Sequence, residues 1–331
     1  MAIQEIRYTI CPVGNASYIA ANKGWLAEGL NKLGVTPVKL QTLPKEHWNV
    51  HFNYQDDALF REGGNIPPIW AKSNGAEAVL IGLTFLPAKD YIVVRADSQI
   101  DSVEQLRGKK LAVPVHPKAE IDFYQATVQR GFETALAARG VAKGEVEFVE
   151  LPVDIEYFGK NEHRPTSLGR IDLEALETGK ADAAYIGNTR GQAALSTGKY
   201  KVIFEIGANA RVLSPINNVY PNVLTVSKKL AEDAPEVVVE YIRQLQRAAE
   251  WAKTNRAEVQ ELFAEQTYGT VGEMIAARRP SFHKHLAITL SEEGLYALES
   301  QKRFLYDHGY IEKDFDIAKW ADNSFLKAAE A

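Results

Sequence analysis

Short apolar stretches alternate with longer amphipathic ones along most of the chain. Residues 78–83 are apolar throughout, which is typical of a strand buried on both faces, and residues 6–10 and 91–95 are rich in β-branched and aromatic side chains. Residues 16–33 and 119–139 carry apolar side chains at helical spacing. This alternation predicts an α/β fold with mainly parallel sheets that are flanked by helices.

The same pattern continues to the end of the chain, where helices take over. Short helices are expected over 97–110, with a turn, and over 171–179. Further strands are expected at 38–40, 111–114, 146–151, 181–186, 202–206 and 223–226. From Ala234 onward the chain is mostly helical, with an apolar stripe made of Val237, Val238, Tyr241, Ile242, Leu245, Ala248, Ala249 and Ala252.

The 331 residues are enough for two domains of ordinary size. The block from about residue 100 to 222 reads as self-contained, so the helical tail must pack back on the first block. We therefore expect two lobes, one formed by residues 1–98 and 223–331 and the other by residues 99–222. A ligand cleft is expected between them.

Charge and cysteine content narrow the class of partner. The 38 Lys and Arg against 43 Asp and Glu give a net charge of -5, which argues against a nucleic-acid surface. A single cysteine excludes an intramolecular disulfide and a Cys-based metal cluster, and suits a reducing compartment. No phosphate-binding Gly-rich loop, serine-hydrolase motif or zinc-protease motif is present. We expect no metal and no cofactor.

The N-terminal residues run directly into the first expected strand, without a basic segment followed by an apolar one. No run of eighteen apolar residues predicts a membrane span. These features predict a cytoplasmic protein, although a chain trimmed of its signal peptide would look the same and would be periplasmic. We expect a monomer.

The only cysteine, Cys11, stands where the first strand gives way to the first helix, with Asn15 as a reasonable N-cap. In open α/β sheets the carboxyl ends of strands line the ligand crevice. A thiol near a helix N-terminus also feels the positive end of the dipole, which favours the thiolate. The alternative is that Cys11 is a small buried hydrophobe.

A second constellation follows at residues 51–68. Arg61 beside Gly63 and Gly64 places a guanidinium next to backbone N–H groups, which suits a small oxyanion. His51 adds a group that titrates near neutral pH. The alternatives are a partly buried histidine with satisfied hydrogen bonds, a surface arginine and a plain turn.

Other side chains are candidates for ligand contact. Tyr54 and Trp70 suit an aromatic wall, although aromatic residues at such positions are usually core. His116 and Arg190 each follow a strand of the second lobe, where they would face the cleft.

Three stretches carry a fold resemblance, at residues 20–30, 176–183 and 226–238. They resemble the two-lobed type 2 periplasmic-binding-protein fold of the sulfonate, nitrate and taurine type. The resemblance runs over nearly the whole chain and implies a hinged cleft. It indicates a fold and not a function.

A more specific resemblance lies in the order of three motifs. These are Cys-Pro-Val-x-Asn-Ala, then His-Phe-x-Tyr with an arginine ten residues after the histidine, then Gly-Gly-x-Ile-Pro-Pro. Together they resemble the aromatic sulfinate desulfinases, which do chemistry in the cleft of this fold. The resemblance implies that Cys11, His51 and Arg61 are catalytic and that Gly64 cradles the sulfinate.

The resemblance implies hydrolytic cleavage of a carbon–sulfur bond without a cofactor, giving sulfite and the desulfinated product. Cys11 would attack sulfur as a thiolate or protonate carbon as a thiol, and the residues leave both open. Substrate contacts are expected from Gly63, Gly64, Tyr54, Asn15, His116 and Arg190. Two departures from the family concern the aromatic part of the substrate: residues 185–190 lack the expected tryptophans, and Glu62 stands beside the arginine in place of an apolar residue.

Two other functions fit this fold. A solute-binding protein of a sulfonate, nitrate or taurine transporter would use Arg61 and Gly64 to hold an anion, would leave Cys11 idle and would have a transporter permease as its partner. A pyrimidine-precursor protein of thiamine synthesis would depend on a His-rich and Cys-rich site, which the sequence does not contain. The Cys–His–Arg set favours the enzyme.

Overall fold

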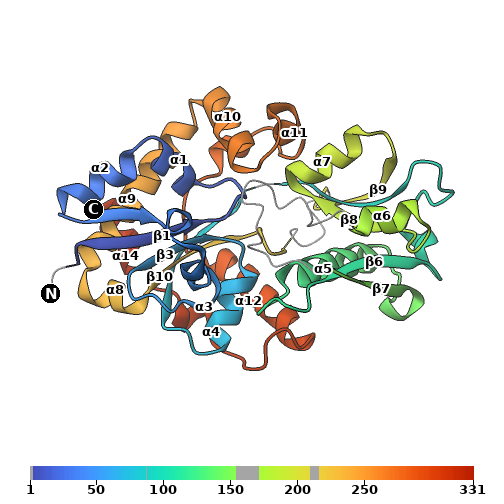
Figure 1. Cartoon of the computed structure of the whole chain (residues 1–331), viewed down its shortest axis with the longest axis horizontal. Helices are drawn as coiled ribbons and strands as arrows, with labels where there is room; N and C mark the ends of the chain where they lie inside the picture. Colours follow the sequence, from blue (N-terminus) through green and yellow to red (C-terminus); the bar gives the residue numbers. More distant parts are fainter. Residues whose placement is uncertain (1–2, 87, 154–170, 209–215) are drawn as a thin grey trace. The chain divides into compact units, whose positions relative to one another are not determined.

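The computed structural model describes residues 3–86, 88–153, 171–208 and 216–331. These residues form two compact α/β units (Figure 1). Unit 1 contains the described residues within 1–87, 218–266 and 281–331, and unit 2 contains those within 88–217 and 267–280. These limits differ from the expected lobes of 1–98 with 223–331 and of 99–222. The strand at residues 90–95 and the segment Thr267–Pro280 both lie in unit 2.

Unit 1 is built on a five-stranded sheet of order β2-β1-β3-β10-β4. Strand β1 runs parallel to β2 and β3, and β10 runs antiparallel to both its neighbours, β3 and β4. The strands are β1 (Glu5–Ile10), β2 (Thr36–Lys39), β3 (Leu59–Gly63), β4 (Ala78–Thr84) and β10 (Asn222–Ser227). The α-helices are α1 (Ala16–Asn22), α2 (Trp25–Lys32), α3 (Val50–Asn53), α4 (Ile66–Ser73), α8 (Lys228–Asp233), α9 (Pro235–Ala252), α10 (Arg256–Gln266), α12 (Glu292–Asp307), α13 (Ile317–Trp320) and α14 (Ser324–Glu330), with 3-10 turns η1 (Leu40–Thr42), η2 (Lys45–His47) and η5 (Phe282–Lys284).

The two faces of this sheet pack against different helices (Figure 1). On one face Phe60 of β3 stacks on Tyr241 of α9, with ring centroids 4.0 Å apart, and α1 packs beside α9. On the other face Leu59 and Tyr54 form a cluster with Ala71 of α4. Because successive strand residues point to opposite faces, each residue of β3 belongs to one of these two layers.

Unit 2 has a second sheet, in which β5 runs antiparallel to its neighbours in the order β8-β5-β9. Strands β6 and β7 pair in parallel, and a parallel bridge between Leu111 and Ala183 links β6 to the residue before β8. The elements are β5 (Asp90–Arg95), β6 (Lys110–Val115), β7 (Glu147–Pro152), β8 (Ala184–Gly187), β9 (Tyr200–Ile206), α5 (Phe123–Ala138), α6 (Ile171–Glu177), α7 (Asn188–Ser196), α11 (Val271–Ala276), η3 (Val103–Leu106) and η4 (Lys143–Glu145).

Three local features differ from the sequence prediction. The helix expected over 16–33 is two helices, because Gly24 takes a left-handed conformation with φ of 72° between α1 and α2. In place of the helix expected over 97–110, the chain forms the 3-10 turn η3 with Ser102 as its N-cap, and Lys110 already begins β6. Strand β3 was not predicted, because Arg61 and Glu62 interrupt the apolar run that marks a strand buried on both faces.

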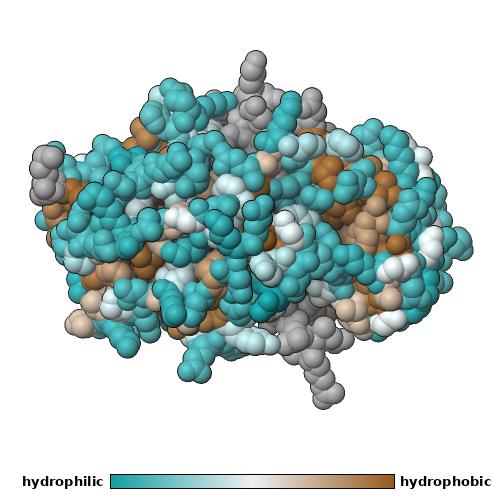
Figure 2. All heavy atoms as spheres, turned by 90° about the horizontal axis from the view of Figure 1, so that it is seen from below, coloured by the Kyte–Doolittle hydropathy of each residue, from teal (hydrophilic) through white to brown (hydrophobic). Residues whose placement is uncertain are grey.

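No helix among the described residues is long and apolar enough to cross a membrane. Figure 2 shows one face of the molecule, on which hydrophilic residues predominate and hydrophobic ones are scattered between them. Such scattered apolar side chains are usual for a folded protein in water.

Candidate active site

Cys11 follows the last residue of β1, and its backbone is held on both sides. Its amide donates to the carbonyl of Glu62 over 2.9 Å, and its carbonyl accepts from Nε2 of Gln266 over 2.9 Å. The side chain lies over Gly63, where an added Cβ would come within 2.1 Å of the sulfur. Gly63 is therefore required for a close approach, and its small size gives the thiol its place.

His51 lies on the short helix α3 and is buried. Its Nε2 is 3.5 Å from Sγ of Cys11 and 3.4 Å from Nη2 of Arg61, and its Nδ1 is 3.0 Å from the hydroxyl of Thr9. A guanidinium can only donate, so Nε2 must accept and Nδ1 carries the proton in the neutral ring. Nε2 is thus able to accept a proton from the thiol.

The charge state of His51 follows from its surroundings. Burial, and then the neighbouring positive charge of Arg61, hold the pKa of His51 well below its ordinary value of 6.5. The imidazole is therefore neutral at pH 7, and Arg61 supplies the positive charge of this cluster.

Arg61 projects from the centre of β3 and is 1% exposed. Its Nε donates to the carbonyl of His51 over 3.1 Å, and its Nη1 donates to the carbonyl of Gly64 over 2.9 Å. Nη2 is 3.9 Å from Sγ of Cys11. Two carbonyl groups thus fix the guanidinium plane, and Nη2 is directed at the thiol and the imidazole.

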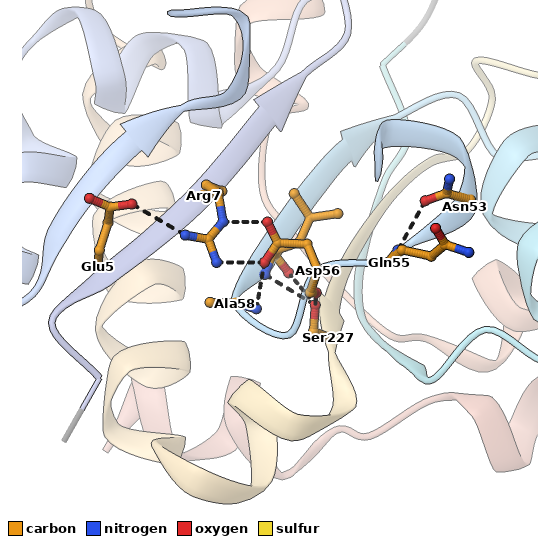
Figure 3. A network of polar contacts seen from close by, with 8 residues as sticks. Glu5, Arg7, Asn53, Gln55, Asp56, Ala58 and Ser227 are labelled. Atoms are coloured by element: carbon orange, nitrogen blue, oxygen red, sulfur yellow. Dashed lines mark hydrogen bonds and ion pairs between the residues drawn. The ribbon is translucent and has the colours of Figure 1, made fainter. Parts of the chain in front are cut away.

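An ion pair holds the segment that connects α3 to β3 (Figure 3). His51 lies on α3 and Arg61 on β3, so this segment joins the two elements that carry them. Arg7 of β1 forms a two-pronged ion pair with Asp56, and the Asp56 carboxylate also accepts from the amide of Ala58 over 2.9 Å. The hydroxyl of Ser227 on β10 donates to the Asp56 carbonyl. Strands on both sides of β3 therefore hold the connection in place.

Of the other expected contacts in unit 1, Asn15 caps α1 as predicted, accepting from the amide of Tyr18 over 3.0 Å. Tyr54 is buried, and its hydroxyl is 2.7 Å from that of Thr225. Gly64 is also buried, and its carbonyl accepts a hydrogen bond from Nη1 of Arg61. Direct contact of these residues, and of Gly63, with a substrate stays a prediction.

His116 and Arg190 belong to unit 2 and are described there alone. His116 is buried, with Nδ1 3.1 Å from the carboxylate of Asp122, which caps α5. Arg190 lies in the first turn of α7 and is exposed. Their contact with a ligand stays a prediction, as does that of Trp70.

Several partners of the cluster were not predicted. The hydroxyl of Thr9 accepts a hydrogen bond from Nε2 of Gln41 over 2.9 Å and also contacts His51. Thr225 lies beside Arg61 on the neighbouring strand. Alternation along β1 would have placed Thr9 and Cys11 on one face. Gln266 is 255 positions from Cys11, and no local pattern indicates their contact.

The part of the chain that the structure describes contains no group of three or more His, Cys, Asp or Glu side chains placed to hold a metal ion. What the cluster around Cys11 offers instead is a thiol, a neutral proton acceptor and a fixed guanidinium. Such a set suits an anionic, electrophilic ligand.

The chain is similar in sequence and fold to known proteins. No protein-family model matches the chain. The 2'-hydroxybiphenyl-2-sulfinate desulfinase of Rhodococcus erythropolis is 26% identical over 353 residues, covering 97% of this chain and 92% of that protein. A Bacillus subtilis (strain 168) protein, named among the aliphatic sulfonates-binding proteins, is 25% identical and covers 99% of this chain and 88% of that one.

Solved structures show the same fold. A cysteine-to-serine mutant of the desulfurization enzyme DSZB, in complex with biphenyl-2-sulfinic acid, superposes with a TM-score of 0.80 at 22% identity, covering 99% of both chains. The periplasmic aliphatic sulphonate binding protein SsuA of Escherichia coli gives 0.68 at 16% identity, covering 97% of this chain and 92% of that one. The chain has the periplasmic-binding-protein fold, and over nearly its whole length it is similar to the aromatic sulfinate desulfinases, as its motifs predict.

Proposed function

We propose that this protein is a sulfinate desulfinase that hydrolyses the carbon–sulfur bond of an organic sulfinate. The reaction converts R–SO2⁻ and water into R–H and hydrogen sulfite. The observation that carries the proposal is the cluster in which the sulfur of the half-buried Cys11 lies 3.5 Å from the buried His51 and 3.9 Å from the buried Arg61. The similarity to a desulfinase over 97% of the chain supports it.

Arg61 would bind the sulfinate oxygens. Its Nε and Nη1 donate to carbonyl groups, so Nη2 is the nitrogen directed at Sγ of Cys11, beside which the sulfinate would bind. A guanidinium held in one orientation meets an oxyanion without a further loss of side-chain entropy. The backbone N–H of Gly64 would provide a second donor.

In the first possible route Cys11 is a nucleophile. His51 takes the thiol proton through Nε2, and the thiolate attacks the sulfinate sulfur. The carbon–sulfur bond breaks with its electrons on carbon, which takes the proton from His51 to give R–H. Water then cleaves the Cys11–SO2⁻ adduct, which restores the thiol and releases hydrogen sulfite.

In the second route Cys11 is a general acid. The thiol protonates the carbon that carries sulfur, the carbon–sulfur bond breaks and sulfur dioxide leaves, to be hydrated to hydrogen sulfite. Arg61 stabilises the resulting thiolate until it regains a proton. Rapid quenching followed by mass spectrometry of the Cys11 peptide separates the routes, because only the first forms an SO2 adduct.

The substrate is proposed to be aromatic, on the strength of the substrate named for the Rhodococcus relative. Tyr185, in the stretch that lacks the family's tryptophans, is buried and bonded to Asp90 and Asn217 within unit 2. It therefore contributes to the core of that unit.

The test is sulfite release from a panel of aryl and alkyl sulfinates, with the matching sulfonates as controls. The proposal predicts sulfite from at least one aryl sulfinate and none from the sulfonates. No sulfite from any sulfinate, together with calorimetric binding of an intact sulfonate, would overturn it.

That second outcome would support a solute-binding protein, which the Bacillus subtilis relative favours. Arg61 would then hold the anion, and the partner would be a transporter permease. The monomeric state predicted from the sequence remains a prediction to be tested with the purified protein. The cytoplasmic location remains a prediction to be tested in host cells.

A further inference from the structure

A buried carboxylic acid lies directly behind the cluster. Glu62 follows Arg61 on β3, and its side chain belongs to the opposite face of the sheet. It is 1% exposed, and its partners in register on the two neighbouring strands are Ile10 and Leu224, both aliphatic. The carboxyl group is thus surrounded within the sheet by hydrocarbon.

The helices above this face give the carboxyl group little polar support. The amide and hydroxyl of Ser17 on α1 are its nearest donors, yet neither carboxyl oxygen has a hydrogen bond of good geometry with any residue of the described ranges. The titratable group that faces it is Tyr241 from α9, which in turn lies near Tyr8 from β1. Burial raises the pKa of both phenols, so both are uncharged near pH 7.

This environment favours the neutral acid. Burial raises the pKa of Glu62 to about 7, and the Ser17 donors oppose the shift only in part. Among the described residues no cationic group forms an ion pair with the carboxyl group. Charged and neutral forms of Glu62 are therefore both populated at neutral pH.

Glu62 is also connected to Cys11 through the backbone. Its carbonyl accepts the Cys11 amide over 2.9 Å, and its side chain meets Ser17, in the first turn of the helix that follows Cys11. A charge on Glu62 would therefore arise one residue from Arg61, at the segment that holds the thiol.

We propose that Glu62 is a positioning residue that sets the pH range of this site through its backbone and electrostatic connection to Cys11. The neutral acid leaves the charge of Arg61 free to stabilise a thiolate and to bind an anion. The ionised acid places a negative charge behind both and weakens each. The effect of Glu62 on catalysis rests on the proposed function. Its effect on Cys11 can be measured from the reactivity of the thiol alone.

The test is the rate at which iodoacetamide alkylates Cys11, in wild type and Glu62→Gln, from about pH 5.5 to about pH 9. The two rates are expected to agree at the acid end. Above pH 7 the variant should react faster, by on the order of tenfold, as expected for one nearby charge at an effective dielectric constant near 20. A ratio that does not change with pH would overturn the proposal.

Two further variants keep the test decisive. Ser17→Ala removes a donor that lowers the pKa of Glu62. The ionisation of Glu62 that slows alkylation of Cys11 should therefore begin at a higher pH than in wild type. This variant decides the matter if Glu62→Gln does not fold, and a pH profile identical to that of wild type would contradict the proposal.

Glu46→Gln, on the exposed turn η2, is the matched control and should follow wild type. No sulfinate is used, so failure here leaves the desulfinase proposal standing, and the reverse also holds.

Discussion

Two consecutive residues of β3, Arg61 and Glu62, are both 1% exposed and have opposite surroundings. Arg61 donates to two carbonyl groups and lies beside the thiol and imidazole. Glu62 lies between aliphatic side chains under α1 and α9. Burial of a charge is tolerated where hydrogen bonds replace water, and is avoided by protonation where they do not.

The two faces of β3 therefore present different environments to neighbouring residues. Because side chains alternate, the residue that would bind substrate and the residue that responds to pH are neighbours in sequence but lie on opposite faces of the sheet. Changing one face should therefore alter chemistry, and changing the other should alter its dependence on pH.

The largest effect is expected where the reactive face has no spare room. Gly63→Ala would place Cβ 2.1 Å from Sγ of Cys11, so the thiol must move. We expect sulfite release to fall at least about 1000-fold and stability to fall by about 1–3 kcal/mol, as overpacking usually costs. Gly144→Ala, where an added Cβ meets nothing within 4 Å, is the control and should retain full activity. Equal activity of the two variants would show that the space at Gly63 is unimportant.

Arg61→Lys keeps the charge on this face and removes its geometry. A lysine cannot make both the His51 and Gly64 carbonyl bonds while also facing the thiol. We expect kcat/KM to fall about 100-fold, in line with the loss of a preorganised donor. Arg95→Lys, at the end of β5 and paired with Asp97, provides a matched exposed substitution that should leave kcat/KM unchanged.

On the other face, Glu62→Gln should change stability in a pH-dependent way. The folded-state pKa of about 7 is above the ordinary 4.5, so the contribution of Glu62 to stability is full below pH 4.5 and is lost as pH rises through 7. Between about pH 4.5 and pH 8 wild type should lose about 3 kcal/mol relative to the variant. Urea unfolding of both proteins across this range measures the difference. A constant difference would contradict the account.

How far the sequence alone predicts this site depends on the kind of contact. The order of Cys11, His51 and Arg61 in three motifs predicts their grouping, and the structure brings them together. The strand that carries Arg61 was not predicted, since a buried arginine and a buried acid break the apolar pattern of a central strand. The contact of Gln266 depends on tertiary folding, which leaves no local signal.

For the fold, too, local sequence patterns predict some features, whereas others depend on tertiary contacts. Alternating apolar stretches predict most strands, and the apolar stripe predicts α9 with all eight of its buried residues. The transfer of Thr267–Pro280 to unit 2 has no such pattern, because it depends on tertiary contacts such as the backbone bond from Lys89 to Ala277.

The smallest effect concerns the acid side of the pH profile. The pKa of His51 is held well below 6.5, so the neutral imidazole persists on mild acidification, and its contribution to stability is lost only as pH falls below 6.5 towards that lowered pKa. We expect kcat/KM to change less than about twofold between pH 7 and pH 6 on account of this group. An NMR titration of the His51 imidazole checks this expectation. A midpoint for His51 at or above 6.5 would refute the neutral-ring assignment.

The central claim is that the thiol of Cys11 carries out the chemistry on the reactive face of β3. The most direct measurement is sulfite release from biphenyl-2-sulfinate by wild type and by Cys11→Ser, with binding of the sulfinate measured in parallel. We expect sulfite from wild type, none from the variant, and similar binding by both. Sulfite release by Cys11→Ser at the wild-type rate would contradict it.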